Sequence, residues 1–130
     1  MDSVTVIHRF VGFAIPAGWF VLAVWALISF VRNRGPAGGF WGLLGALQVV
    51  VGLQFLVGGI LFLAGRRAPG GSLAWLHYVY GALFPAALLI WAHGLAKGRF
   101  RDVPFVPFGI AALLCFGLTA RALMTGLQGA

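Results

Sequence analysis

Four apolar segments, each long enough to cross a bilayer, are separated by three short breaks rich in charged and turn residues. The segments cover residues 4–31, 39–64, 72–96 and 104–126. A membrane core takes roughly 20 apolar residues per helix, and 62% of this chain is hydrophobic while only 8% is charged. Because short connections place successive helices side by side and antiparallel, the sequence predicts an all-α membrane protein: a single four-helix transmembrane domain over residues 1–130, with up-down-up-down topology.

The net charge of +7 is concentrated at the ends of these segments and not in a separate basic domain, so we expect no nucleic-acid binding. The first and third breaks, which lie on one side of the membrane, hold five basic residues: Arg32, Arg34, Lys97, Arg99 and Arg101. The opposite side of the membrane holds four: Arg9, Arg66, Arg67 and Arg121. Cytoplasmic loops carry an excess of Lys and Arg. We therefore predict a multi-pass protein of the cell inner (cytoplasmic) membrane, with the lipid bilayer as a partner and both termini outside. Asp2 stands where a signal peptide would be basic, which argues against a cleaved leader.

A ten-residue template, His-x-x-x-Gly-x-x-x-Pro-Ala, occurs twice, at residues 8–17 and 77–86. Each copy lies in the first part of an apolar segment, so we interpret the chain as two repeated helical hairpins. Copies with an even number of spans point the same way in the membrane. This places His8 and His77 at matched depth, near the surface where both termini lie. The alternative is a duplication that is retained only for helix packing.

The two histidines predict a cofactor site, because a histidine at membrane depth is costly and usually functional. Two neutral imidazoles that face each other across a bundle are the ligands of a low-spin heme b. We therefore predict one bis-His heme b, with His8 and His77 on its iron. Gly12 and Gly81 follow one helical turn later on nearly the same face, where they would let a flat group or another helix approach the backbone.

Basic side chains on the same side of the membrane would meet the heme propionates. Arginine pairs bidentately with carboxylates, so Arg9 and Arg121 are the predicted propionate partners. Arg121 interrupts the last apolar segment, where its alternative is to snorkel to the surface. Arg66 and Arg67 are interpreted as anchors of the second break to the lipid headgroups.

Other features of the spans indicate packing. Glycines recur every seven residues in the second segment, at Gly45, Gly52 and Gly59. Such small-residue stripes let membrane helices pack closely, although a porphyrin face against one of them is the alternative. Gln48 and Gln54 are expected to form interhelical hydrogen bonds.

Three further residues complete the expectations for the spans. Pro16 and Pro85 are expected to bend the first and third helices alike, and Cys115 is expected to be buried in packing.

His93 does not fit the paired site. It follows His77 by sixteen residues on the same helix, which is roughly 24 Å along the axis and about 160° around it. If His77 faces the core, His93 faces lipid or a partner near the other surface. We interpret it as an interfacial polar residue near Lys97; the alternatives are a ligand to a cofactor shared with another subunit, or to a single-ligand pigment.

The residue types that are missing exclude several function classes. The only acidic residues, Asp2 and Asp102, lie outside the spans. Without a carboxylate at membrane depth, a proton-coupled carrier or small multidrug exporter is disfavoured. The sequence also lacks a nucleotide-binding loop, a CxxC pair and a Ser/His/Asp set. We therefore do not expect the chain to be an enzyme by itself.

Paired histidines on repeated hairpins of a four-helix bundle resemble one half of heme A synthase. They also resemble the four-helix cytochrome b family, which passes electrons between quinol and other carriers. The His8-Arg9 pair with Gly12 is similar to the His-Arg-x-x-Gly stretch in the membrane anchor of succinate dehydrogenase. Two departures matter: those cytochromes usually hold two hemes on four histidines, and heme A synthase carries its ligands on other helices of the half. The resemblance implies a mode of heme binding, with quinone as a possible partner, and no particular activity.

The predicted function is a heme b-binding electron-transfer subunit within a larger respiratory or photosynthetic complex, in contact with other membrane subunits. One alternative is a structural or accessory subunit of such a complex without a cofactor. A second is a chlorophyll-binding subunit that uses single histidine ligands, and a third is an enzyme of heme modification. A Soret band in the purified protein would indicate heme, and absorption in the red or near infrared would indicate chlorophyll instead.

Overall fold

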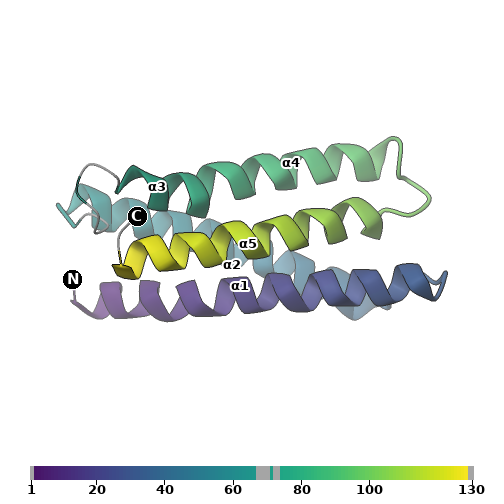
Figure 1. The fold of residues 1–130 in the computed structure, drawn as a ribbon, viewed down its shortest axis with the longest axis horizontal. Coiled ribbons are helices and arrows are strands. Elements are labelled where there is room, and N and C mark those ends of the chain that lie inside the picture. The colour runs from purple at the N-terminus through teal and green to yellow at the C-terminus, as the bar shows by residue number, and fades with distance from the viewer. Residues whose placement is uncertain (1, 67–70, 72–73, 129–130) are drawn as a thin grey trace.

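The computed structural model describes residues 2–66, 71 and 74–128, and its long elements are all helices. In chain order these are α1 (Asp2–Val31), α2 (Gly38–Leu63), α3 (Trp75–Tyr78), the π-helix η2 (Val79–Leu83), α4 (Phe84–Lys97) and α5 (Phe105–Gln128). The elements α3, η2 and α4 follow without a break and form the third span. Figure 1 shows successive spans running in opposite directions, with both termini at one end of the bundle. The predicted all-α, up-down-up-down bundle is confirmed.

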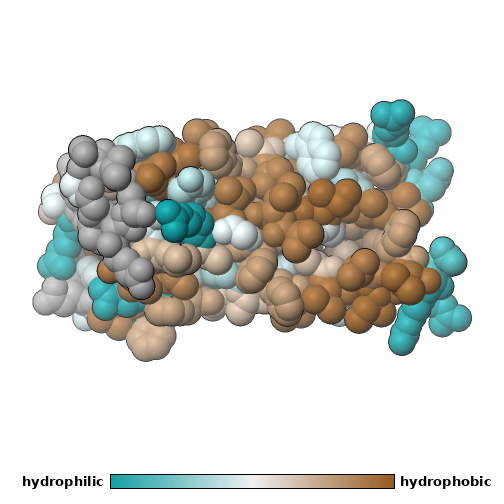
Figure 2. All heavy atoms as spheres, in the orientation of Figure 1, coloured by the Kyte–Doolittle hydropathy of each residue, from teal (hydrophilic) through white to brown (hydrophobic). Residues whose placement is uncertain are grey.

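Among the described residues, four helices are long and apolar enough to cross a membrane, and their bounds lie within three residues of the predicted segments. They are Ser3–Val31, Gly38–Leu63, Trp75–Lys97 and Phe105–Leu127. Apolar surface covers much of the middle of the bundle, and hydrophilic side chains gather at the end opposite the termini (Figure 2). The chain is a multi-pass membrane protein.

The helices do not pack equally with one another. α1 packs against both α5 and α2, while the third span packs against α5. α1 and α5 approach each other closely, because a Cβ built on Gly109 would lie 2.5 Å from the Cβ of Ala26. Small residues on α5, among them Ala111, Ala112 and the predicted packing residue Cys115, are completely buried. Small side chains at such contacts let membrane helices approach closely. Because α5 and α2 are the neighbours of α1, the third span lies diagonally across the bundle from α1.

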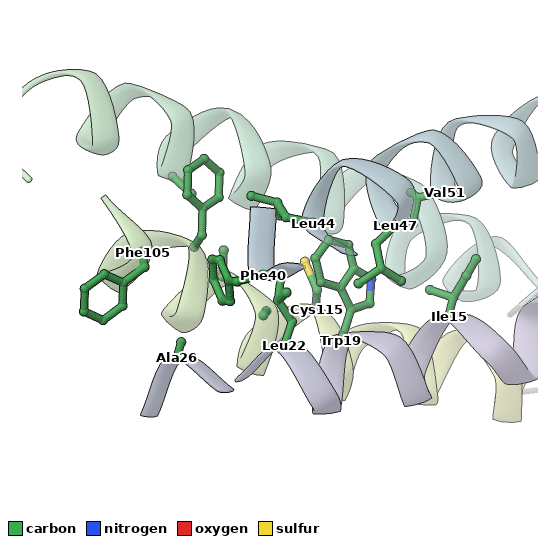
Figure 3. Close-up of a cluster of buried hydrophobic side chains, with 14 residues drawn as sticks. Ile15, Trp19, Leu22, Ala26, Phe40, Leu44, Leu47, Val51, Phe105 and Cys115 are labelled. Atoms are coloured by element: carbon green, nitrogen blue, oxygen red, sulfur yellow. The ribbon is translucent and has the colours of Figure 1, made fainter. Parts of the chain in front are cut away.

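The densest core lies in the half of the bundle away from the termini. Trp19 and Leu22 of α1 and Phe40 of α2 are fully buried there, and they meet Cys115 of α5 (Figure 3). Ile15 and Val51 lie at the edge of this cluster (Figure 3). The other half of the bundle holds a cavity.

Two of the spans end in the same kind of cap. At the end of α1, Asn33 adopts a left-handed conformation (φ 54°) and the N–H of Arg34 donates to the carbonyl of Ser29 at 3.1 Å. At the end of α2, Gly65 (φ 84°) lets the N–H of Arg66 donate to the carbonyl of Leu61 at 2.8 Å. These are Schellman motifs. Each places one arginine directly after a helix, on a backbone held by hydrogen bonds.

The two template prolines lie in different backbone settings. Pro16 lies inside α1, which remains an α-helix throughout. Pro85 is preceded by η2, where the N–H of Phe84 donates to the carbonyl of Val79. Proline has no N–H to donate to the carbonyl four residues before it. In the third span, the wider π turn directly before Pro85 replaces the α-helical hydrogen-bond pattern. The expected likeness of the two helices does not extend to these turns.

Candidate functional site

A cavity of about 680 Å³ lies among all four spans at the end of the bundle where the termini lie. Ligand pockets in proteins commonly measure roughly 300–1,000 Å³. Ile15 and Val51, at the edge of the packed core, also line this cavity. Both template histidines line it as well, together with Gln54 of α2. This cavity therefore lies next to the packed core, on the side of the termini.

The structure brings the two predicted ligands together. The ring centroids of His8 and His77 lie 6.2 Å apart, with an angle of 72° between the ring planes. If the two imidazoles faced one metal from opposite sides, with metal–nitrogen bonds of about 2.0 Å and about 1.1 Å from nitrogen to centroid, their centroids would lie roughly 6.2 Å apart. The observed spacing therefore fits two axial ligands on one iron.

His77 is oriented by α5. Its Nδ1 lies 2.7 Å from the carbonyl oxygen of Ala122. Because a carbonyl only accepts, Nδ1 carries the proton and donates, which leaves the lone pair on Nε2 for a metal. Metal-binding histidines usually have such a partner on the second ring nitrogen. The ring also lies against Gly126, where an added Cβ would come within 2.8 Å of Cε1 and 3.0 Å of Nδ1.

His8 is held mainly through its backbone. Its carbonyl oxygen accepts a 2.7 Å hydrogen bond from Nε2 of Gln54, which joins α1 to α2; the predicted interhelical role of Gln54 is confirmed. The Nδ1 atom of His8 is buried and has no hydrogen-bond partner within the described part of the chain. A buried polar atom left unpaired costs roughly 1–3 kcal/mol. A ligand atom that meets Nδ1 would remove that cost, whereas a metal bound at Nε2 would leave Nδ1 in need of a partner.

The glycines that touch the two imidazoles come from other spans. A Cβ on Gly58 of α2 would lie 3.3 Å from Cε1 of His8, and Gly126 of α5 takes the same place beside His77. The predicted Gly12 and Gly81 also line the cavity. However, a Cβ on Gly12 would first meet Leu123 at 3.6 Å, and one on Gly81 would meet Ala122 at 3.3 Å. The template glycines serve helix contacts, and sequence reasoning missed Gly58 and Gly126 because neither lies in the repeat.

Among the described residues, two arginines line the cavity, and one of them belongs to the predicted pair. Arg9 is exposed and lines it, as predicted for a propionate partner. Arg66 also lines it, and its Nη1 donates to Oγ1 of Thr5 at 3.4 Å. Arg121 is exposed and is not among the lining residues, while Arg67 lies outside the described residues. From the sequence alone, Arg66 is expected to be an anchor of the second break to the lipid headgroups.

His93 lies outside this cavity and joins two spans. Its Nε2 is 2.7 Å from Oε1 of Gln48, so the imidazole N–H donates to the amide oxygen. Its ring centroid lies 4.8 Å from that of Phe108 on α5. The predicted interhelical bond of Gln48 is confirmed. His93 is exposed, as expected for a residue at the lipid-facing surface, but it also packs within the bundle.

The donor atoms suit a metal that brings other ligands with it. Over residues 2–66, 71 and 74–128, no group of three or more His, Cys, Asp or Glu side chains could hold a metal ion. A bare zinc ion takes three or four protein ligands, whereas a porphyrin supplies four nitrogens and needs one or two axial ligands. The pair His8 and His77 therefore fits heme better than a bare ion.

Comparisons with known proteins give no match: no family model, no curated protein and no solved structure matches the chain. Function is therefore inferred from the geometry of the cavity and the chemistry of its side chains.

Proposed function

We propose that the protein is a heme b-binding electron-transfer subunit, with His8 and His77 as the axial ligands of one heme near the surface on the side of both termini. The observation that carries this proposal is the 6.2 Å spacing of the two rings within a cavity of about 680 Å³. The two imidazoles come from diagonally opposite spans, so a flat group between them would lie in the centre of the bundle.

Each residue of the cavity has a distinct role in this proposal. A heme held by His8 and His77 would supply one-electron transfer. The carbonyl of Ala122 holds the ring of His77 in the tautomer that offers Nε2. Arg9 and Arg66 are placed to meet the propionates, while Arg121 would reach them only from outside the lining. Ile15 and Val51 form an apolar wall that keeps water from the inner edge.

The subunit would lie in the cytoplasmic membrane beside its redox partners. The basic residues favour a cytoplasmic membrane with both termini outside. A single heme near one surface cannot carry an electron across the bilayer alone. The subunit would therefore exchange electrons on that side with a quinone or with another membrane subunit of a respiratory or photosynthetic complex. α2 packs mainly on α1, which leaves much of its surface for lipid or such a subunit.

A cofactor-free accessory subunit is the second candidate, and the interhelical bonds of Gln54 and Gln48 would serve it equally well. A chlorophyll-binding subunit is less well supported, because one chlorophyll takes one axial ligand and the two histidines lie beside each other.

The test is a pyridine hemochrome spectrum of the full chain, purified in detergent from heme-replete cells. We expect one heme b per chain. His8→Ala and His77→Ala should each lower heme content by about 100-fold. Even the loss of a residue that hydrogen-bonds to a metal-binding histidine typically lowers metal affinity by 10- to 100-fold. The matched control is His93→Ala, which should keep its heme. A folded, colourless protein would favour the accessory subunit, and absorption in the red or near infrared would favour chlorophyll.

A further inference from the structure

A second cavity, of about 480 Å³, lies at the opposite end of the bundle between loop 1 (residues 32–37) and loop 3 (residues 98–104). Its lining combines the apolar side chains of Phe30 and Trp41 with one cation, Arg34, and one acid, Asp102. No ion pair joins Arg34 or Asp102 to another residue in the portion that the structure describes. The packed core separates this cavity from His8, so it is not part of the proposed heme site.

Backbone hydrogen bonds hold both walls of the cavity. On the loop 1 side, the Schellman motif at Asn33 holds the backbone of Arg34. On the loop 3 side, the N–H of Arg101 donates to Gly98 at 3.2 Å and the N–H of Val103 donates to Phe100 at 3.0 Å. The cavity is therefore a feature of ordered turns, and a ligand would not have to order them on binding.

The charge at this end is strongly positive. Five exposed basic residues lie in or beside the two loops: Arg32, Arg34, Lys97, Arg99 and Arg101. Asp102 is the single acidic residue there. Figure 2 shows the hydrophilic side chains projecting from this end in two groups, with apolar surface between them. A negatively charged ligand with an apolar part matches both properties.

We propose that this cavity binds an anionic phospholipid, with Arg34 donating to the phosphate and an acyl chain lying along Phe30 and Val103. A guanidinium forms bidentate hydrogen bonds to phosphate oxygens. Phe30 is 62% exposed and Val103 is 42% exposed, so the apolar rim faces the bilayer. A zwitterionic headgroup would add a positive amine to a region that is already positive. Basic pockets between membrane helices bind anionic headgroups by this chemistry.

The experiment is native mass spectrometry of the full chain, released from detergent after incubation with phosphatidylglycerol, phosphatidylcholine or inorganic phosphate. We expect one retained phosphatidylglycerol per chain, little phosphatidylcholine, and no displacement by inorganic phosphate. Arg34→Gln should lower retention by about tenfold or more, as for loss of a hydrogen bond to a charged group. Arg34→Lys keeps the positive charge but cannot form bidentate hydrogen bonds, so its lipid retention should lie between those of the wild type and Arg34→Gln.

The matched control is Arg32→Gln, which removes the same charge from the same loop but from a residue that does not line the cavity. General attraction to an anionic surface would lower retention by about fivefold for either arginine. Equal losses in the two variants would therefore overturn the proposal. So would equal retention of phosphatidylcholine, or displacement of the lipid by inorganic phosphate, which would assign the site to a soluble anion. The outcome does not depend on heme, because neither variant touches the other cavity.

Discussion

His8 and His77 begin the same ten-residue template, yet their surroundings differ. The ring of His77 donates to Ala122 at 2.7 Å and lies tightly against Gly126. The ring of His8 has an unpartnered Nδ1 within the described structure and a looser contact with Gly58, and the strong hydrogen bond in this half goes to its backbone. The two template histidines lie side by side, with ring centroids 6.2 Å apart, but the neighbouring helices decide how firmly each ring is held.

The helices that carry the two rings also differ. α1 continues as an α-helix through Pro16, whereas the π turns of η2 follow directly after the short helix that holds His77. A π segment rotates the residues beyond it relative to an α-helix, and such segments are frequent at functional sites. Equal spacing in the sequence therefore does not place equal residues on equal faces.

The largest difference between the halves is expected from Gly126→Ala. The new methyl group would lie within 3.0 Å of two atoms of the His77 ring, and overpacking of this kind costs about 1–3 kcal/mol. Heme content should therefore fall by roughly 5- to 100-fold in a pyridine hemochrome assay at limiting heme. The control on the same helix is Gly117→Ala, because nothing lies within 4 Å of a Cβ there. Equal heme loss in both variants would show that Gly126 does not hold His77.

A smaller effect is expected from Gly58→Ala in the other half. Its methyl group would lie 3.3 Å from Cε1 of His8, and a ring without a hydrogen bond at Nδ1 can move by a few tenths of an ångström. We expect heme content to fall by about two- to fivefold, at the low end of overpacking costs. Gly52→Ala on the same helix is the control, since its Cβ would meet nothing within 4 Å. A greater loss than in Gly126→Ala would reverse the comparison.

The smallest effect is expected from Gln54→Leu, which removes the hydrogen bond to the backbone of His8. Interhelical hydrogen bonds in membranes average about 0.6 kcal/mol, so thermal unfolding in detergent should shift only slightly and heme content should change by less than about threefold. Gln48→Leu, which removes the bond to His93, should shift unfolding equally and leave heme content unchanged. Complete heme loss in Gln54→Leu would mean that His8 depends on this bond far more than on its ring contacts.

The number of spans, their order and the end of the bundle at which the two template histidines lie could be predicted from the amino-acid sequence. Bilayer thickness dictates the length of an apolar helix, and short breaks leave antiparallel neighbours as the solution. The burial of Cys115 and the charged residues between the spans could be predicted in the same way. The interhelical bonds of Gln48 and Gln54 were also predictable, because polar groups at membrane depth must find partners within the protein.

The contacts between particular helices, and the side chains that meet the imidazoles, could not be predicted in this way and are known from the folded bundle. The spacing of residues along the sequence did not indicate three features of the bundle. These are the close contact of α1 with α5, the position of Gly58 and Gly126 beside the rings, and the presence of Arg66 and not Arg121 in the cavity lining. Each depends on the rotation of one helix about its axis relative to its neighbours. In a chain that is apolar on nearly every face, hydrophobic periodicity does not specify that rotation, and close packing of small residues decides it.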